Sequence, residues 1–154
     1  MKIQSFLPEF IGKKTEPENL HLTLKFLSEV DEKEIEKIRS KLREINFNKF
    51  NCSIYSIGIF SKNFIKIVWL HLDKCSDLQI VIDNKLEEIG FQKEKRFMSH
   101  LTIARVKKVK DRDKFISEIN KIKIPDLFFL VDNFKLKKST LTPDGPIYET
   151  IEEY

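Results

Sequence analysis

Glycine, histidine and cysteine are all scarce in this sequence. Among 154 residues, four are Gly, three are His and two are Cys. So few glycines argue against a glycine-rich loop that binds phosphates through its backbone. The cysteines, Cys52 and Cys75, lie in apolar segments, with no Cys-x-x-Cys spacing and no His or Cys cluster around them. We therefore expect free thiols, and neither a disulfide nor a structural metal site.

Long hydrophobic runs are absent as well. No apolar segment has the length that crosses a bilayer, and the first residues lack the hydrophobic core of a secretory signal. We therefore expect a cytoplasmic protein without membrane contact and without an obligate protein partner. No linker rich in Ser, Pro or Gly divides the chain, so residues 1–154 are expected to form a single domain.

The basic residues are unevenly distributed. The formal net charge is +4, and Lys and Arg concentrate at residues 105–110 and 135–138. Such stretches could raise the positive potential near a phosphate-bearing ligand. The alternative is an ordinary solvated surface.

Hydrophobic periodicity predicts an α+β fold. Alternation with period two predicts strands, and apolar residues at steps of three and four predict amphipathic helices. Hairpin connections dominate the order, which favours antiparallel sheets over a parallel doubly wound sheet. The expected strands cover 20–26, 50–59, 64–72, 101–106, 127–138 and the residues after a Pro-Asp-Gly turn at 143–145; the expected helices cover 31–45, 76–89 and 111–122.

Two of the three histidines stand in the same short motif, His, apolar, Thr, apolar. The motifs are His21-Leu-Thr23-Leu and His100-Leu-Thr102-Ile. Residues two apart on a strand project from the same face, so each His shares a face with its Thr. If the two strands face each other across a cleft, two imidazoles and two hydroxyls converge on one small volume.

This set of groups suits the hydrolysis of a phosphodiester. A neutral imidazole can take a proton from attacking water while a protonated imidazole gives one to the departing oxygen. The Thr hydroxyls can hydrogen-bond the non-bridging oxygens. We expect no metal and no cofactor, because three scattered histidines make a poor zinc ligand set and no carboxylate cluster suggests a two-metal site.

Three segments carry a resemblance to a known family. The segments "ENLHLTLKFL", "SHLTIARV" and "KKSTLTPDGPIYE" resemble the two-histidine (2H) phosphoesterase superfamily, and within it the RNA 2′,3′-cyclic phosphodiesterases once described as 2′-5′ RNA ligases. The resemblance extends over nearly the whole chain from Thr15 onward. It implies a bilobal α+β fold in which two antiparallel sheets flank a central cleft and helices lie outside.

The resemblance also implies an activity and residue roles. Family members open a terminal 2′,3′-cyclic phosphate to a 2′-phosphate; by analogy His21 would be the proton donor and His100 the proton acceptor. Thr23 and Thr102 would bind the phosphate. The partner would be RNA with a 2′,3′-cyclic phosphate end or a small cyclic phosphodiester. A catalytically weak RNA-end-binding module and 2′-5′ joining of RNA ends by the reverse reaction stay open as alternatives.

Arg105 matches a basic position that is common in the second motif of the family. Strand parity places it on the face opposite His100, so its side chain would reach substrate only through a bulge or a bent conformation. The alternative is a surface position or an ion pair.

The remaining histidine and the aromatic residues have plainer interpretations. His71 has Asp73 where the motif needs Thr, so we expect a structural histidine. Trp69 and most Phe residues are expected in the core, although one of them, or Tyr148, could stack on a nucleobase.

The first residues differ from the family pattern. Relatives usually have a strand and a helix before the first motif, whereas only 20 residues precede His21. We expect the family's first strand to be absent, which would leave an unpaired sheet edge.

Overall fold

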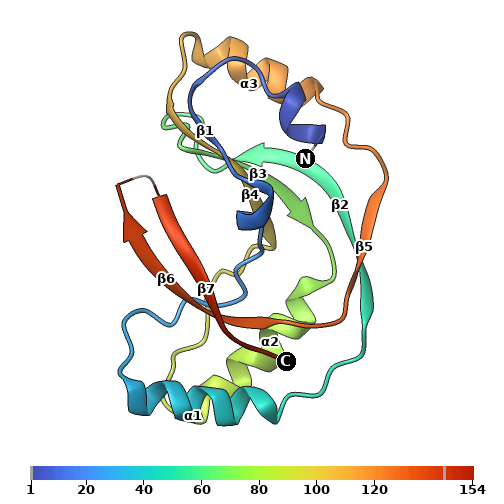
Figure 1. Ribbon diagram of the computed structural model, residues 1–154. Coiled ribbons are helices and arrows are strands. Elements are labelled where there is room, and N and C mark those ends of the chain that lie inside the picture. Colours follow the sequence, from blue (N-terminus) through green and yellow to red (C-terminus); the bar gives the residue numbers. More distant parts are fainter. Residues whose placement is uncertain (1, 144) are drawn as a thin grey trace. The chain divides into compact units, whose positions relative to one another are not determined.

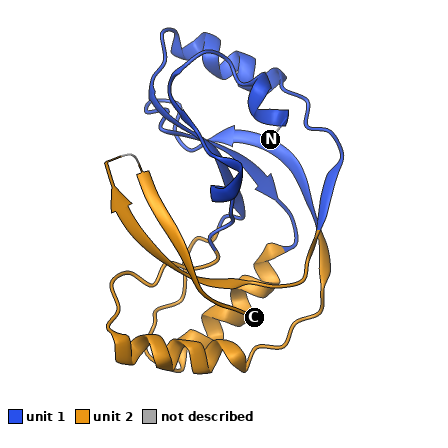
Figure 2. Cartoon of the chain, in the orientation of Figure 1, with its two compact units in different colours: residues 1–23, 52–74, 98–129 blue, residues 24–51, 75–97, 130–154 orange. Residues whose placement is uncertain are grey.

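The computed structural model, which describes residues 2–143 and 145–154, shows two compact units, each assembled from three separate segments (Figure 2). Both units combine helices with antiparallel strands, which confirms the bilobal α+β organisation. Unit 1 contains residues 1–23, 52–74 and 98–129, and unit 2 contains residues 24–51, 75–97 and 130–154.

Unit 1 is built on a five-stranded sheet with the strand order β1-β4-β3-β2-β5 (Figure 1). Strict alternation is clearest in β3, where Val68, Leu70 and Leu72 are buried and the residues between them are half-buried, as expected for a strand with one face in the core. The strands are β1 (Ile11–Lys14), β2 (Phe50–Ile59), β3 (Ile67–Leu72), β4 (His100–Lys108) and β5 (Leu127–Val131); β2 and β5 each run from one unit into the other.

Short helices complete unit 1. Helix α3 (Arg112–Lys121) begins at Asp111, whose side chain accepts a hydrogen bond from the backbone N–H of Lys114, and it buries Phe115 and Ile119. A 3₁₀ helix at Lys2–Phe6 is tied to the sheet by Gln4. The buried Gln4 amide donates to the backbone oxygens of Thr15 and Ile103, at 2.6 and 2.9 Å.

Unit 2 packs two helices against a hairpin. Helix α1 (Glu32–Arg43) begins with a capping box between Asp31 and Glu34, and α2 (Cys75–Glu87) contacts α1. Strands β6 (Lys135–Thr142) and β7 (Gly145–Glu153) pair antiparallel. The core cluster joins both helices to the strand region through Ile38, Leu42, Ile45, Leu78, Ile82, Leu86, Phe134 and Leu136.

The expected strand at 20–26 is wrong, because only Leu22 forms a bridge, to Leu101. The chain enters unit 2 after Thr23, and Leu24 packs against the core of that unit. Lys25, expected on a polar face, is buried in an ion pair, whereas Phe26, expected inside, is 80% exposed. The alternating pattern did not reveal this change of packing partner.

The expected single strand at 127–138 is also wrong, since residues 132–134 separate β5 from β6. Phe134 makes two backbone hydrogen bonds with Tyr154, so the chain begins a different pairing there. The expected turn at 143–145 includes Asp144, which lies outside the described residues; Gly145 has a φ of +128°, which favours glycine.

Strand β1 was not predicted from the sequence. It occupies one end of the strand order, pairing with β4. At Gly12, an added Cβ would lie 2.2 Å from the Arg105 backbone oxygen, so this close approach requires glycine. The absence of the family's first strand stays a prediction.

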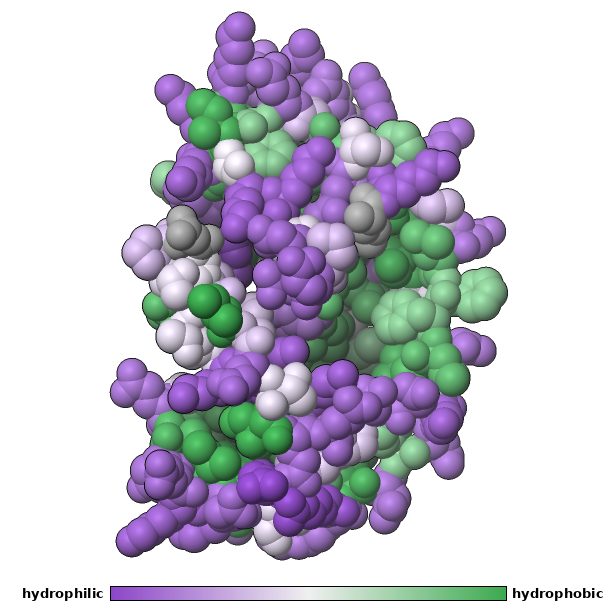
Figure 3. Space-filling model, viewed as in Figure 1, coloured by the Kyte–Doolittle hydropathy of each residue, from purple (hydrophilic) through white to green (hydrophobic). Residues whose placement is uncertain are grey.

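Hydrophobic side chains appear on the surface among hydrophilic ones (Figure 3). Several of them are phenylalanines, so the expectation that most Phe lie in the core is only partly right. Among the described residues no helix is long and apolar enough to span a membrane. The exposed phenylalanines are Phe6, Phe26, Phe60, Phe64, Phe128 and Phe129.

The buried ion pair in unit 2 gives a stability prediction. The side chains of Lys25 and Asp83 are each 6% exposed, and Asp83 also accepts hydrogen bonds from Gln79 and the Glu94 backbone. We expect Asp83→Asn to lower the free energy of unfolding by about 3–5 kcal/mol, because it leaves a buried ammonium without its countercharge. Urea unfolding at neutral pH measures this loss.

The control is Glu88→Gln, which removes surface ion pairs with Lys41 and Lys85 and should cost less than about 1 kcal/mol. Burial raises the pKa of Asp83, but the hydrogen bonds from Lys25, Glu94 and Gln79 together hold it below its usual value. The stabilisation is therefore present above the unfolded-state pKa of Asp and is lost as the pH falls through the lower folded-state pKa. Equal losses in the two variants would contradict the prediction.

Candidate functional site

The two His-x-Thr motifs lie side by side in unit 1. Leu22 and Leu101 form an antiparallel bridge, so His21 flanks Thr102 and Thr23 flanks His100. Side chains alternate between faces along each strand, so the two leucines project from one face and the four polar residues from the other. The motifs therefore meet as neighbouring extended segments of one unit, and not across a cleft.

Strands β3 and β2 continue this face. Residues paired across the strands form two rows, and each strand adds one residue to each row. In the β3–β4 pairing, His71 is opposite His100 and Trp69 is opposite Thr102. Gly58 pairs with Trp69, and an added Cβ there would lie 2.7 Å from the indole ring, so glycine makes room for the tryptophan. From β2 to the 21–23 segment, the first row is Ser56, His71, His100, Thr23 and the second is Gly58, Trp69, Thr102, His21.

Both motif histidines hold their rings in the same way. His21 Nδ1 lies 2.7 Å from the backbone oxygen of Asn19, and His100 Nδ1 lies 2.8 Å from that of Met98. A carbonyl oxygen only accepts hydrogen bonds, so each Nδ1 carries the proton that it donates. Proton exchange with a substrate would then fall to Nε2 in both rings.

A bulge in β4 changes the face on which Arg105 lies. Val68 pairs with Ala104, but the next residue, Trp69, pairs with Thr102, so Ile103 is an extra residue in β4. Ile103 and Ala104 are both buried, and alternation resumes with an exposed Arg105. Arg105 is opposite Ile67, which is on the same face of β3 as Trp69 and His71. The bulge therefore returns Arg105 to the face of the two motifs.

Aromatic rings surround two of the histidines. Phe60, just after β2, meets the His100 ring edge-on with centroids 5.0 Å apart, and the Trp69 ring meets His71 at 5.8 Å. The β2–β3 register shifts at Tyr55, and the Tyr55 hydroxyl lies 2.8 Å from His71 Nδ1. Trp69, expected in the core, is half-buried on this face.

His71 was expected to be structural, yet it lies next to His100. Burial lowers its pKa, and the positive charge of protonated His100 lowers it further. A signal was present in the sequence, since Trp69 and His71 alternate with buried residues in a strand as the motif residues do. Without the strand pairing, nothing indicated that this strand lies beside β4.

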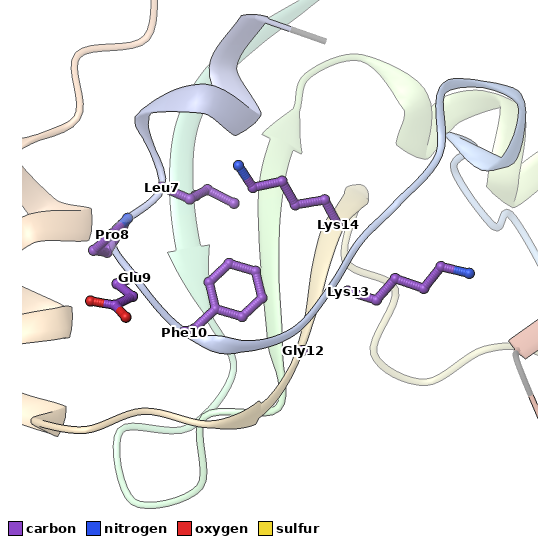
Figure 4. A pocket seen from close by; sticks show the side chains of 7 residues that line it. All are labelled: Leu7, Pro8, Glu9, Phe10, Gly12, Lys13 and Lys14. Carbon is purple, nitrogen blue, oxygen red and sulfur yellow. The ribbon is translucent and has the colours of Figure 1, made fainter.

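No metal centre is suggested by the side chains: in residues 2–143 and 145–154, no group of three or more His, Cys, Asp or Glu could hold an ion. A surface hollow of about 510 Å³ is lined by residues 7–10 and 12–14 (Figure 4). None of the motif residues lines it, and its two lysines point in different directions. We therefore place the candidate site on the sheet face and not in this hollow.

Comparison with known families identifies a phosphoesterase family. The family model described as LigT-like phosphoesterase matches residues 2–69 and 72–148. The chain belongs to this family. It is 40% identical over 146 residues to an RNA 2′,3′-cyclic phosphodiesterase of Methanocaldococcus jannaschii, with 92% of this chain and 83% of that protein aligned. A protein of the same name from Archaeoglobus fulgidus is 34% identical over 99% of this chain and 91% of its own length.

Solved structures show the same fold for this LigT-like phosphoesterase. TT0787 of Thermus thermophilus superposes with a TM-score of 0.81 at 24% identity, covering 99% of this chain and 87% of its own. E. coli LigT complexed with 3′-AMP gives a TM-score of 0.73 at 20% identity, covering 99% of this chain and 90% of its own.

The backbone hydrogen bonds of the motif histidines predict their tautomers. In the neutral state, His21 and His100 should both carry the proton on Nδ1, although Nε2 is the other possible position. Long-range ¹H–¹⁵N correlation spectra of the imidazoles at about pH 8, where an ordinary histidine is neutral, measure this directly. The chain has three histidines, so single His→Gln variants assign every signal. A proton on Nε2 of either motif histidine would contradict the geometry.

Proposed function

We propose that this LigT-like phosphoesterase hydrolyses RNA 2′,3′-cyclic phosphate ends to 2′-phosphates, without a metal, using His21 as the proton donor and His100 as the proton acceptor. The observation that carries the proposal is the pairing of the motifs at Leu22 and Leu101, which sets two imidazoles and two hydroxyls on one face. Relatives named RNA 2′,3′-cyclic phosphodiesterase support the reaction.

The proposed reaction needs one proton at each end of an in-line displacement. Neutral His100 takes a proton from water through Nε2 as the new O–P bond forms. Protonated His21 gives a proton to the 3′ oxygen as the P–O3′ bond breaks. His21 and His100 occupy diagonal corners of the four-residue block, so donor and acceptor lie on opposite sides of a phosphorus held above it. The histidines end with exchanged protonation states, which solvent restores.

The remaining groups would stabilise the phosphate. Thr23 and Thr102 occupy the other diagonal and can donate their hydroxyl protons to the non-bridging oxygens. Arg105 lies beyond Thr102 on the same face and can pair with the negative charge. Its bond to substrate would be charge-assisted in both the ground state and the transition state.

The central test uses RNA that ends in 2′,3′-cyclic phosphate, with excess EDTA. We expect the parent chain to form the 2′-phosphate, and His21→Ala and His100→Ala each to lower kcat by about 10²–10⁴-fold, because each removes one proton transfer. Product mobility is compared with 2′- and 3′-phosphate standards. Thr23→Val and Thr102→Val keep side-chain volume while removing one hydroxyl each.

Each other outcome has a defined meaning. If the folded parent chain binds RNA with a cyclic phosphate end but does not hydrolyse it, the result would favour the RNA-end-binding module. Activity that EDTA abolishes and added metal restores would overturn the metal-free mechanism. Formation of 2′-5′ linked RNA from mixed ends would favour the joining reaction.

Arg105 gives a separate prediction about substrate binding. We expect Arg105→Gln to raise KM by roughly 10-fold or more with a smaller change in kcat, because a charge-assisted hydrogen bond contributes about 1.5–3 kcal/mol. Steady-state kinetics measure the split. The matched control is Arg112→Gln on α3, where the arginine is exposed and lies near Asp113. Identical kinetics for both variants would show that Arg105 does not bind substrate.

A further inference from the structure

Phe60 is a large apolar residue beside the candidate site, and the proposed reaction gives it no task. It follows the last residue of β2, and alternation along that strand puts it on the same face as Ser56 and Gly58, which is the face of the two motifs. Its ring centroid lies 5.0 Å from that of His100, yet the residue is 52% exposed. Phe60 therefore presents a free aromatic surface next to the proposed proton acceptor.

The Trp69 ring lies between Phe60 and the sheet. The centroids of the two rings are 5.5 Å apart, and their planes are tilted by 38°. The indole lies against Gly58, where an added Cβ would collide with it. The indole Nε1 is buried and has no hydrogen-bond partner among the described residues. Trp69 thus fills the space next to the sheet, and the Phe60 ring forms an outer layer.

A nucleoside 2′,3′-cyclic phosphate has a shape that matches this arrangement. Its phosphate bridges O2′ and O3′, and its base is attached to C1′, the carbon next to C2′. The base and the two bridging oxygens project from opposite faces of the ribose. A phosphate bound on the motif face would therefore hold the base nearby but raised from the sheet, at the level of the outer layer that Phe60 forms.

Two neighbouring rings fit this role less well. Trp69 is half-buried, and Phe60 covers part of it. Tyr55 is 55% exposed, but its ring lies 4.6 Å from that of His71, and its hydroxyl is hydrogen-bonded to the same residue. In the row of paired residues, His71 stands between β2 and His100. Of the three rings, Phe60 combines exposure with contact to a motif histidine.

We propose that the Phe60 ring is the platform on which the terminal nucleobase of the substrate stacks while the cyclic phosphate lies on the motif face. Every base has a π face, so stacking on Phe60 accepts all four bases and favours the larger purines. The inference rests on the proposed function, from which it takes the position of the phosphate. It gives Phe60 a role in binding and none in proton transfer.

The first experiment measures binding without turnover. Two probes carry the same phosphate and differ in the base: adenosine 2′-monophosphate and methyl β-D-ribofuranoside 2-phosphate. Trp69 is the one tryptophan of the chain and contacts Phe60, so its fluorescence follows both titrations. We expect the parent chain to bind the adenosine probe about 10-fold more tightly than the baseless probe, because stacking of a base on an aromatic ring is worth this much. Cytidine 2′-monophosphate should bind with an affinity between the two.

Three variants locate the base. Phe60→Leu keeps an apolar side chain without an aromatic face, so it should weaken binding of the adenosine probe about 10-fold and leave the baseless probe unchanged. Phe60→Tyr retains a ring and should keep the preference for the base. The matched control is Phe64→Leu, in the connection between β2 and β3, where Phe64 is 74% exposed; it should also keep the preference. Circular dichroism and thermal unfolding establish that each variant is folded.

Three results would overturn the inference. Equal affinity of the parent chain for the adenosine and baseless probes would show that no base is bound. An unchanged preference in Phe60→Leu would show that the base binds elsewhere, and its loss in Tyr55→Leu would then place the base on Tyr55. Equal weakening of both probes in Phe60→Leu would show that the ring only supports His100.

Kinetics separate this inference from the proposed function. The substrates are adenosine 2′,3′-cyclic phosphate and the 2,3-cyclic phosphate of methyl β-D-ribofuranoside. Phe60→Leu should raise KM about 10-fold for the first substrate, with a smaller change in kcat, and leave the second unchanged. Hydrolysis by the parent chain with the same KM in Phe60→Leu would keep the proposed function and overturn the platform. No hydrolysis by the parent chain, with a base preference that Phe60→Leu abolishes, would overturn the proposed function and keep the base-binding role of Phe60.

Discussion

The antiparallel contact between Leu22 and Leu101 is the interaction on which the candidate site depends. A single bridge sets the register of the 21–23 segment against β4, and a shift of one residue would turn both polar side chains to the other face. Two more contacts lie on the same edge of β4. The Thr15 N–H donates a hydrogen bond to the Ile103 backbone oxygen, and β1 pairs with β4. The first motif therefore belongs to a longer stretch of chain that runs alongside β4.

Two irregularities in the sheet determine which side chains reach the site. The extra residue Ile103 restores Arg105 to the motif face, and the register shift at Tyr55 lets its hydroxyl meet His71. Bulges commonly re-aim side chains near functional sites. In this protein they add the Arg105 cation to the face of the two motifs and bring the Tyr55 hydroxyl to His71.

The rest of unit 1 supports this face from behind. Val68, Leu70 and Ile103 are fully buried, so the strands that carry the polar rows are anchored in a packed interior. Unit 2 has its own core and an ion pair between Lys25 and Asp83 immediately after the first motif. The chain thus passes from the candidate site into the core of the second unit within two residues.

Sequence periodicity predicted much of this architecture but not its irregular parts. The helices at 31–45, 76–89 and 111–122 were placed to within two residues at each end, because amphipathic spacing and capping residues are local signals. Strand 20–26 was wrong because the pattern does not show that Leu24 packs in another unit. Strand β1 was missed because Ile11–Lys14 has no alternation.

By itself, the sequence determined the α+β class, the two His-x-Thr motifs and the fact that each His shares a face with its Thr, since these depend on local periodicity and residue chemistry. Only the tertiary structure decided that the motifs are direct neighbours, that Arg105 lies on their face and that His71 lies beside His100. Strand pairing and bulges join residues that are distant in the chain, and their energies come from hydrogen bonds and packing that a single strand does not encode.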